Sequence, residues 1–268
     1  MFSVSNQSCA EDLGAFQVDK EDTLRVVVAG EVRAGKSAFI NVLARGAILP
    51  DLTGDLGSLP VIVRHSETPW LGVKDEDGKI TRIDDLNDLK IAGSTELLIG
   101  AQMPHLSALE LVEVPFSHEG DVSDESLDLM NSADVLVWLT IGSQAWRLSE
   151  QSIVNRLDDD AAKHRLLVVS RSDKLRSQTD REKIKGRLER ETVDYFDKIF
   201  FMHGRGELIT KSGQDEDAWE KTVGRSFFTT LEELIAQNIS PALDDAEMNA
   251  LDGNEVESNI VELRPMNG

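Results

Sequence analysis

The sequence has almost no cysteine, few aromatic residues and no long apolar run. Its single cysteine is Cys9, so no disulfide framework can form, which suits a reducing cytoplasm. No stretch approaches the roughly 20 apolar residues that a membrane span needs. The N-terminus lacks the basic start and the apolar run of a signal peptide. These absences predict a cytoplasmic protein without a transmembrane segment, whose contact with membranes is at most peripheral.

Basic residues are also scarce, because 28 Lys and Arg stand against 49 Asp and Glu, which gives a net charge of −21. Such a surface repels nucleic acid and anionic lipid, so we expect no nucleic-acid partner. Residues 163–190 depart from that balance, with ten Lys or Arg and four Asp or Glu. This basic face is interpreted either as a docking surface or as a solvated helix face. As a docking surface it would bind an acidic partner, an anionic membrane or the acidic C-terminal segment of this chain.

The most specific motif lies at 30–37, where Gly-Glu-Val-Arg-Ala-Gly-Lys-Ser fits G-x-x-x-x-G-K-[ST]. A buried strand is predicted just before it, at 24–29, and an apolar helical pattern follows it. Glycines let the backbone wrap a polyphosphate with its N–H groups pointing inward, and the helix adds its positive end. Lys36 can reach the outer phosphates, and the Ser37 hydroxyl can ligate Mg²⁺. The predicted nucleotide-binding residues of this loop are Gly30, Glu31, Val32, Arg33, Ala34, Gly35, Lys36, Ser37 and Ala38.

Strand and helix patterns alternate along the rest of the chain. Strands are predicted at 61–65, 97–99, 109–114, 134–141, 165–169 and 198–202, and a hairpin around Asp77-Gly78; helices are predicted at 124–132, 148–157, 179–194 and 217–238. This alternation predicts an α/β fold, a mostly parallel sheet with helices on both faces. We expect one domain at 23–240, between a flexible acidic arm at 1–22 and a disordered acidic tail at 241–268.

Several segments together resemble the motifs of bacterial dynamin-like GTPases over roughly residues 23–240. They are, in chain order, the phosphate loop, Ile48-Leu49-Pro50, Leu59-Pro60-Val61, the strand at 109–115 and Ser170-Arg171-Ser172-Asp173. The resemblance implies a P-loop GTPase domain, or G domain, that binds GTP or GDP with Mg²⁺. Asp173 would accept hydrogen bonds from guanine N1–H and its exocyclic amine, a pattern that adenine does not offer. The stem of Arg171 would lie over the base.

The chain departs from this family at both switch segments. The second switch usually has Asp-x-Pro-Gly, and this chain has Glu113-Val114-Pro115-Phe116. Glu113 is the candidate cation ligand, whereas Phe116 replaces a glycine whose backbone senses the γ-phosphate. No threonine falls in register for the first switch, where Thr53 and Ser58 are the nearest substitutes. Val32 stands where the family often has a polar side chain that positions water.

Arg33 resembles a residue of a related branch, the guanylate-binding and atlastin group, whose phosphate loop has G-x-x-R-x-G-K-S. That arginine acts in cis as an arginine finger. A guanidinium over the bridge between the β- and γ-phosphates would neutralise the charge that develops in phosphoryl transfer. Lys36 and Arg33 are therefore the candidate catalytic residues. The alternative is that Arg33 is a solvated side chain at the tip of a loop.

Three functions are consistent with these residues. The first is a slow Mg²⁺-dependent GTPase, dynamin-like but without a stalk, since only about 28 residues follow the last predicted helix. A homodimer contact or a helical dynamin-like partner would stimulate it and recruit it to the membrane periphery. The second is a pseudo-GTPase, a GTP-binding regulatory or assembly partner with little hydrolysis, as the altered switches favour. The third is a P-loop ATPase or kinase, against which Asp173 and the strand order argue.

Overall fold

The computed structural model of the chain describes residues 23–49, 58–85, 93–116, 122–158, 161–175, 177–239 and 260–262. Its strands are β1 (Leu24–Gly30), β2 (Val61–His65), β3 (Trp70–Asp75), β4 (Ile80–Ile83), β5 (Ser94–Ala101), β6 (Leu109–Glu113), β7 (Val135–Ile141), β8 (His164–Ser170), β9 (Lys198–Phe201) and β10 (Ile260–Glu262). Its α-helices are α1 (Lys36–Leu43), α2 (Asp124–Asn131), α3 (Leu148–Val154), α4 (Gln178–Glu191), α5 (Gly206–Ser212), α6 (Glu216–Thr222) and α7 (Gly224–Ile239). Short 3₁₀ turns are η5 (Pro104–Leu106), η6 (Gly142–Gln144) and η7 (Ser172–Lys174).

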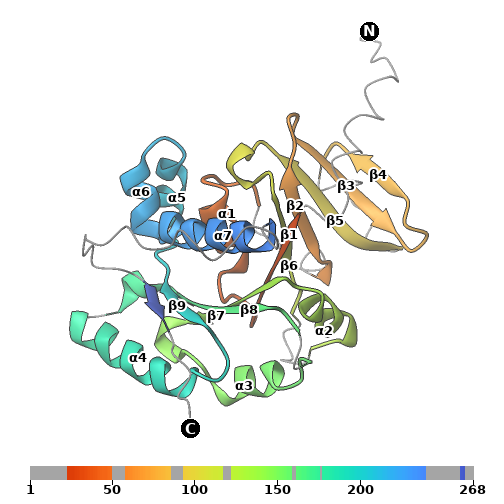
Figure 1. Cartoon of the computed structure of the whole chain (residues 1–268). Helices are drawn as coiled ribbons and strands as arrows, with labels where there is room; N and C mark the ends of the chain where they lie inside the picture. Colours follow the sequence, from red (N-terminus) through yellow and green to blue (C-terminus); the bar gives the residue numbers. More distant parts are fainter. Residues whose placement is uncertain are drawn as a thin grey trace.

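One ten-stranded sheet runs through the molecule in the order β10-β9-β8-β7-β1-β6-β2-β5-β3-β4 (Figure 1). Strands β9, β8, β7, β1 and β6 are parallel neighbours, whereas β2 runs antiparallel to β6. The predicted hairpin is confirmed as β3 and β4, and β3 joins it to β5. Parallel neighbours need crossover connections, which the helices between the strands provide. The α/β fold predicted from the alternating patterns is therefore confirmed.

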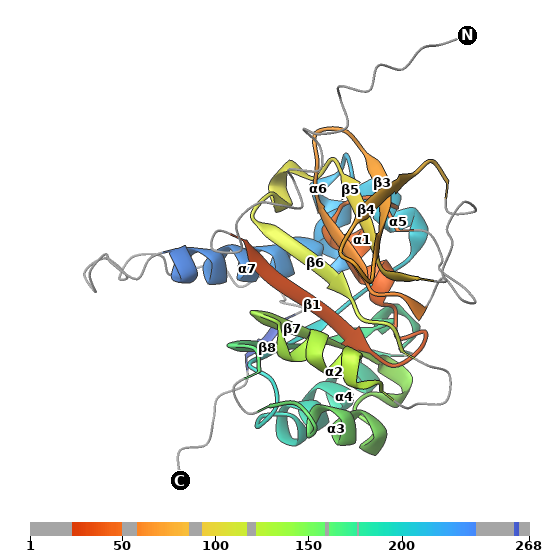
Figure 2. The ribbon, with the colours of Figure 1, turned by 90° about the vertical axis from the view of Figure 1, so that its right-hand side faces the viewer.

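Helices cover both faces of this sheet, with α1, α5, α6 and α7 on one side and α2, α3 and α4 on the other (Figures 1 and 2). Two clusters of buried apolar side chains result. Val26 and Val28 of β1 face the first cluster, and Val27 and Ala29 face the second. Successive side chains of a strand point to opposite faces, so a strand covered on both sides must be apolar throughout. This is why 26–29 is an unbroken apolar run.

The single helix predicted over 217–238 is wrong, because the chain forms α6 and α7 with a break at Val223, whose φ is 85°. Trp219 packs so closely on Gly224 that a Cβ there would lie 2.0 Å from the indole Nε1. That Nε1 also donates to the carbonyl oxygen of Val42 at 2.8 Å. The buried indole thus fixes a turn that periodicity does not reveal. Helix α5 is a further element that the sequence patterns do not predict.

The C-terminal segment, for which the sequence predicts disorder, contains a strand. Residues 260–262 form β10, antiparallel to β9, with Val261 opposite Ile199. Disorder is therefore the wrong prediction for these three residues. The rest of 241–268, the arm at 1–22 and the loop residue Thr53 lie outside the described residues, so the domain limits stay predictions. No helix in the described part of the chain combines the length and apolar character needed to cross a membrane.

Candidate functional site

The predicted phosphate loop lies between the carboxyl end of β1 and the start of α1, at the sheet edge where open α/β folds bind ligands. Gly30 has a φ of 139°, and a Cβ there would lie 2.4 Å from the carbonyl oxygen of Leu139. Gly35 has a φ of 100° and caps α1. Both positions require glycine, since other residues rarely adopt this backbone conformation. The loop of the motif is therefore formed.

Lys36 begins α1 and is buried, with 9% of the residue exposed. Its Nζ donates to the carbonyl oxygens of Gly30 at 3.0 Å and Glu31 at 3.4 Å, and lies 5.1 Å from the ring centre of Phe116. Burial lowers the pKa of Lys36, and the nearby Glu113 carboxylate opposes that shift. Backbone carbonyls carry no net charge, so a phosphate oxygen would be a stronger partner for this ammonium group.

Ser37 and Glu113 lie side by side next to the loop. The Ser37 hydroxyl donates to Glu113 Oε1 at 2.9 Å, because the pairing of β1 with β6 sets Val28 opposite Glu113. Burial raises the pKa of Glu113, while Lys36 and the Ser37 hydrogen bond lower it. The other carboxylate oxygen, Oε2, is buried with no hydrogen-bond partner among the described residues. These two oxygen ligands fit Mg²⁺, which prefers oxygen and binds few protein groups.

In nucleotide sites Mg²⁺ binds through one or two protein groups together with substrate phosphates and waters. Across the described ranges, no group of three or more His, Cys, Asp or Glu side chains could hold a metal ion.

The predicted base-reading segment follows β8 and lies against the phosphate loop. Arg171 has a φ of 55°, and its Nη2 donates to the carbonyl oxygen of Arg33 at 3.0 Å. A Cβ on Gly35 would lie 3.6 Å from the Cβ of Ser170. The fold thus brings together two predicted site segments that are distant in the sequence, since Arg33 and Arg171 are 138 residues apart.

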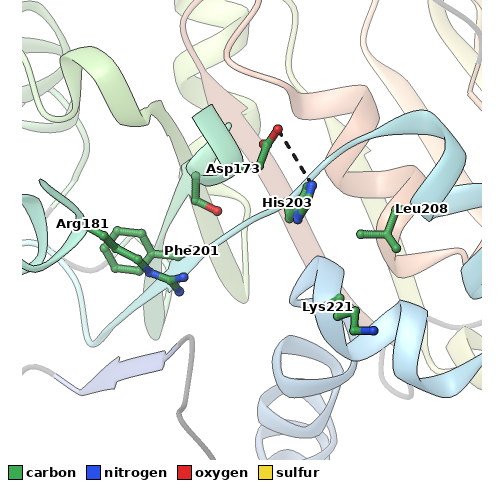
Figure 3. A pocket seen from close by; sticks show the side chains of 7 residues that line it. Asp173, Arg181, Phe201, His203, Leu208 and Lys221 are labelled. Atoms are coloured by element: carbon green, nitrogen blue, oxygen red, sulfur yellow. Dashed lines mark ion pairs between the residues drawn. The ribbon is translucent and has the colours of Figure 1, made fainter. Parts of the chain in front are cut away.

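Asp173 borders a cavity of about 290 Å³ at the other end of the site. Its side chain is 7% exposed, and Arg205 Nε donates to Oδ2 at 3.1 Å. His203 Nε2 lies 3.8 Å from the same oxygen (Figure 3). The volume is just below the roughly 300–1,000 Å³ of drug-sized ligand pockets, so it suits one base rather than a whole nucleotide. The other lining residues are Ser172, Arg181, Phe201, Leu208 and Lys221.

Arg33 and two residues of the switch segments differ from what the family motif would provide. Arg33 is exposed at the loop tip, with a φ of 61°, and its side chain has no hydrogen bond or ion pair with any described residue. Phe116 is partly buried and packs edge-on against Trp138, with ring centres 5.9 Å apart. Ser58 is exposed. The predicted phosphate-binding part of the site is therefore assembled, whereas Arg33 and Ser58 are exposed.

The sequence patterns missed a contact between the phosphate loop and α3. The Glu31 carboxylate forms an ion pair with Arg147 and accepts a hydrogen bond from Ser149 Oγ at 2.7 Å. The buried Trp146 beside them packs edge-on against Phe196, with ring centres 5.2 Å apart, so it anchors this turn in the core. Only the spacing of Arg147 and Glu150 at a helix start signals this turn, and it does not reveal the partner.

No family model and no curated protein matches the sequence. Two solved structures of an oligomerised bacterial dynamin pair, which provides a mechanism for long-range sensing and tethering of membranes, are similar. Their TM-scores are 0.56 and 0.55, at 18% and 16% sequence identity. Each match covers 86% of this chain but only 36% of the dynamin chain, so this chain spans well under half of their length. Aquifex aeolicus Era bound to GDP and aluminium fluoride shares 15% identity over 76% of this chain and 56% of its own, with a TM-score of 0.42.

At such identities the likeness to the bacterial dynamin structures concerns the fold. The chain has the α/β G-domain architecture of P-loop GTPases, and its predicted phosphate loop lies between β1 and α1.

Proposed function

We propose that this chain is a guanine-nucleotide-binding protein that hydrolyses GTP slowly with Mg²⁺, as a dynamin-like GTPase domain. The observation that carries the proposal is that a G-domain fold brings a formed P-loop motif next to a cavity bordered by Asp173. Lys36, Ser37 and Glu113 lie at one end, and Asp173 lies beside a cavity of base size at the other. Arg171 connects the two ends through its hydrogen bond to the phosphate loop.

Each of these residues has a definite role in the proposal. Lys36 would exchange the loop carbonyls for the β- and γ-phosphate oxygens, and the loop amides would hold the rest of the polyphosphate. Ser37 and Glu113 would hold Mg²⁺, which neutralises negative charge on the phosphates when bound. Asp173 would accept two hydrogen bonds from guanine, and adenine has no matching donors, so GTP should bind more tightly than ATP.

Arg33 is proposed as the second catalytic residue beside Lys36. Its exposed side chain has no partner among the described residues, so it can turn toward a nucleotide without breaking an existing contact. An arginine finger contributes roughly 10³–10⁵-fold in rate in related enzymes. Single-turnover hydrolysis at saturating GTP should therefore slow by orders of magnitude in Arg33→Ala while GTP affinity hardly changes. An unchanged rate would leave Arg33 as a solvated loop residue.

The second candidate function is GTP binding with little or no hydrolysis. Phe116 favours it, because this side chain packs against Trp138 at the position where the family has a mobile glycine. A residue whose ring is packed in that way cannot move its backbone N–H toward the γ-phosphate as a glycine does. The protein would then act as a regulatory or assembly partner.

We also propose that association with a second copy or with a helical dynamin-like protein stimulates the site. Leu148, at the start of α3, is 82% exposed, and its two neighbours in the chain hold Glu31 of the phosphate loop. A partner that covers Leu148 would therefore contact residues attached to the phosphate loop. Membrane contact, if the protein makes any, would come through such a partner or through the basic face at 163–190.

Phosphate release from GTP and Mg²⁺ over a series of protein concentrations tests these proposals, with Lys36→Ala as the control. Release that rises faster than linearly with protein, and is lost in the variant, is the outcome expected of an association-stimulated GTPase. GTP binding without phosphate release at any concentration would favour the second candidate. Absence of GTP binding would overturn both.

A further inference from the structure

The predicted phosphate loop carries a carboxylate on a residue whose backbone contacts Lys36. Glu31 directly follows Gly30, and its carbonyl oxygen accepts a hydrogen bond from Lys36 Nζ at 3.4 Å. A nucleoside triphosphate brings several negative charges to the same loop. Two like charges close together in a partly buried site repel strongly, because the effective dielectric constant is well below that of water. A free carboxylate at this position would therefore weaken nucleotide binding.

The structure holds this carboxylate against α3. Arg147 forms an ion pair with Glu31, and Ser149 Oγ donates to its Oε1 at 2.7 Å. The Glu31 side chain is 19% exposed and that of Arg147 is 46% exposed. Both oxygens of the carboxylate thus have a donor, and its charge has a counterion from an element outside the loop.

The turn that carries Arg147 is itself fixed by a buried group. Glu150, which is 2% exposed, accepts hydrogen bonds from Trp138 Nε1 at 3.1 Å and Thr140 Oγ1 at 3.0 Å. It also accepts one from the backbone N–H of Arg147 at 2.8 Å. The backbone N–H of Trp146 donates to Thr140 Oγ1 at 3.0 Å. Because this network anchors the turn to β7, the position of the Arg147 backbone does not depend on the ion pair with Glu31.

We propose that Arg147 is a positioning residue of the nucleotide site, which neutralises Glu31 and holds its side chain against α3 so that the phosphate loop can accept a triphosphate. The inference rests on the proposed function, since it requires nucleotide to bind at this loop. Residues at the start of α3 would then directly influence the affinity for nucleotide. The same turn presents the exposed Leu148, so a partner bound there would act on affinity through Arg147.

The test is a comparison of GTP, GDP and GMP affinities in the full chain with Mg²⁺. The variants are Arg147→Ala, Glu31→Gln and the double variant, with Arg156→Ala as a matched control. Arg156 also belongs to the α3 region, its side chain is 42% exposed, and it pairs with Asp124 at 3.8 Å. We expect Arg147→Ala to weaken GTP binding roughly tenfold, GDP less and GMP least, because repulsion grows with phosphate charge. Glu31→Gln should restore the loss in the double variant.

Two outcomes would overturn the inference. Equal losses for GTP, GDP and GMP that Glu31→Gln does not rescue would mean that Arg147 only supports the local structure. An affinity in Arg147→Ala equal to that of Arg156→Ala would mean that Glu31 needs no counterion. Failure of the proposed function looks different, because the unmodified chain would then bind none of the three nucleotides. Thermal unfolding of each nucleotide-free variant checks that the fold is intact.

Discussion

The two ends of the proposed nucleotide site are built in different ways. At the phosphate end, the functional groups come from two adjacent parallel strands and the first turn of a helix. Lys36 is buried there, and Ser37 is bonded to Glu113 at 2.9 Å. At the base end, Asp173 belongs to a short 3₁₀ turn, and its partner Arg205, whose side chain is 68% exposed, precedes α5.

At the phosphate end the fold fixes the positions of the functional groups, whereas at the base end the contact of Asp173 with Arg205 must be exchanged when a nucleotide binds. Strand register and glycine backbone geometry fix the phosphate end, so a nucleotide would find its ligands in place. The base end holds its key carboxylate with a protein cation, which guanine would have to replace or share. Changes at the phosphate end should therefore affect every nucleotide, whereas changes at the base end should alter the choice among nucleotides.

The largest expected effect lies at the base end. Asp173→Ala should weaken GTP binding by about two orders of magnitude or more and leave ATP affinity almost unchanged, because it removes the acceptor for two guanine donors. Competition of GTP and ATP against a fluorescent GDP analogue measures both affinities. Asp217→Asn on the exposed surface of α6 is the charge control. Equal losses for both nucleotides would show that Asp173 does not select the base.

At the phosphate end, Glu113→Gln should reduce the advantage that Mg²⁺ gives to nucleotide binding by about tenfold, since it removes a charged ligand worth about 1.4 kcal/mol or more. The measurement is GTP affinity with Mg²⁺ and with excess chelator. Glu113→Asp keeps the charge and shortens the reach, so its value should lie between those of the unmodified chain and Glu113→Gln. An identical Mg²⁺ dependence in all three proteins would remove Glu113 from the metal site.

The same substitution should stabilise the nucleotide-free protein at neutral pH. Burial raises the pKa of Glu113 above the value in the unfolded chain, so its contribution to stability is present below the unfolded pKa and is lost as pH rises through the folded pKa. Removing the buried charge should raise the free energy of unfolding at pH 7 by roughly 1–3 kcal/mol. Chemical denaturation at pH 7 and pH 5 tests this, and the gain should shrink at pH 5. A loss at pH 7 would contradict it.

The phosphate end was also the part that the sequence predicted best. The motif at 30–37 is contiguous, and the apolar run before it and the helical pattern after it are local signals, so loop, strand and helix could all be placed. The alternation of strands and helices and the hairpin at Asp77-Gly78 followed from similar short-range patterns. Where neighbouring residues determine the structure, the sequence was sufficient.

The features that escaped prediction depend on contacts between distant residues. Trp219 interrupts the helix predicted over 217–238, and its indole N–H donates a hydrogen bond to Val42, 177 residues away in the chain. The contact of Glu31 with Ser149 spans 118 residues, and that of Asp173 with Arg205 spans 32 residues. Each joins two segments whose sequences give no sign of the other. Periodicity reports which face of an element is buried, and it carries no information on which side chain lies opposite.

The smallest expected effect would sharpen the contrast between the two ends. Arg205→Ala frees Asp173 Oδ2 from its Arg205 partner, so GTP should bind more tightly, by up to about fivefold, since an ion pair with a solvent-exposed cation is worth about 0–1 kcal/mol. The difference should fade at high salt, because screening weakens the pair in the unmodified chain. Lys211→Ala is the matched control, since its side chain is also 68% exposed and pairs with Asp215 at 3.1 Å. If Arg205→Ala instead weakens GTP binding, Arg205 holds Asp173 in position for the base, and the base end is preorganised like the phosphate end.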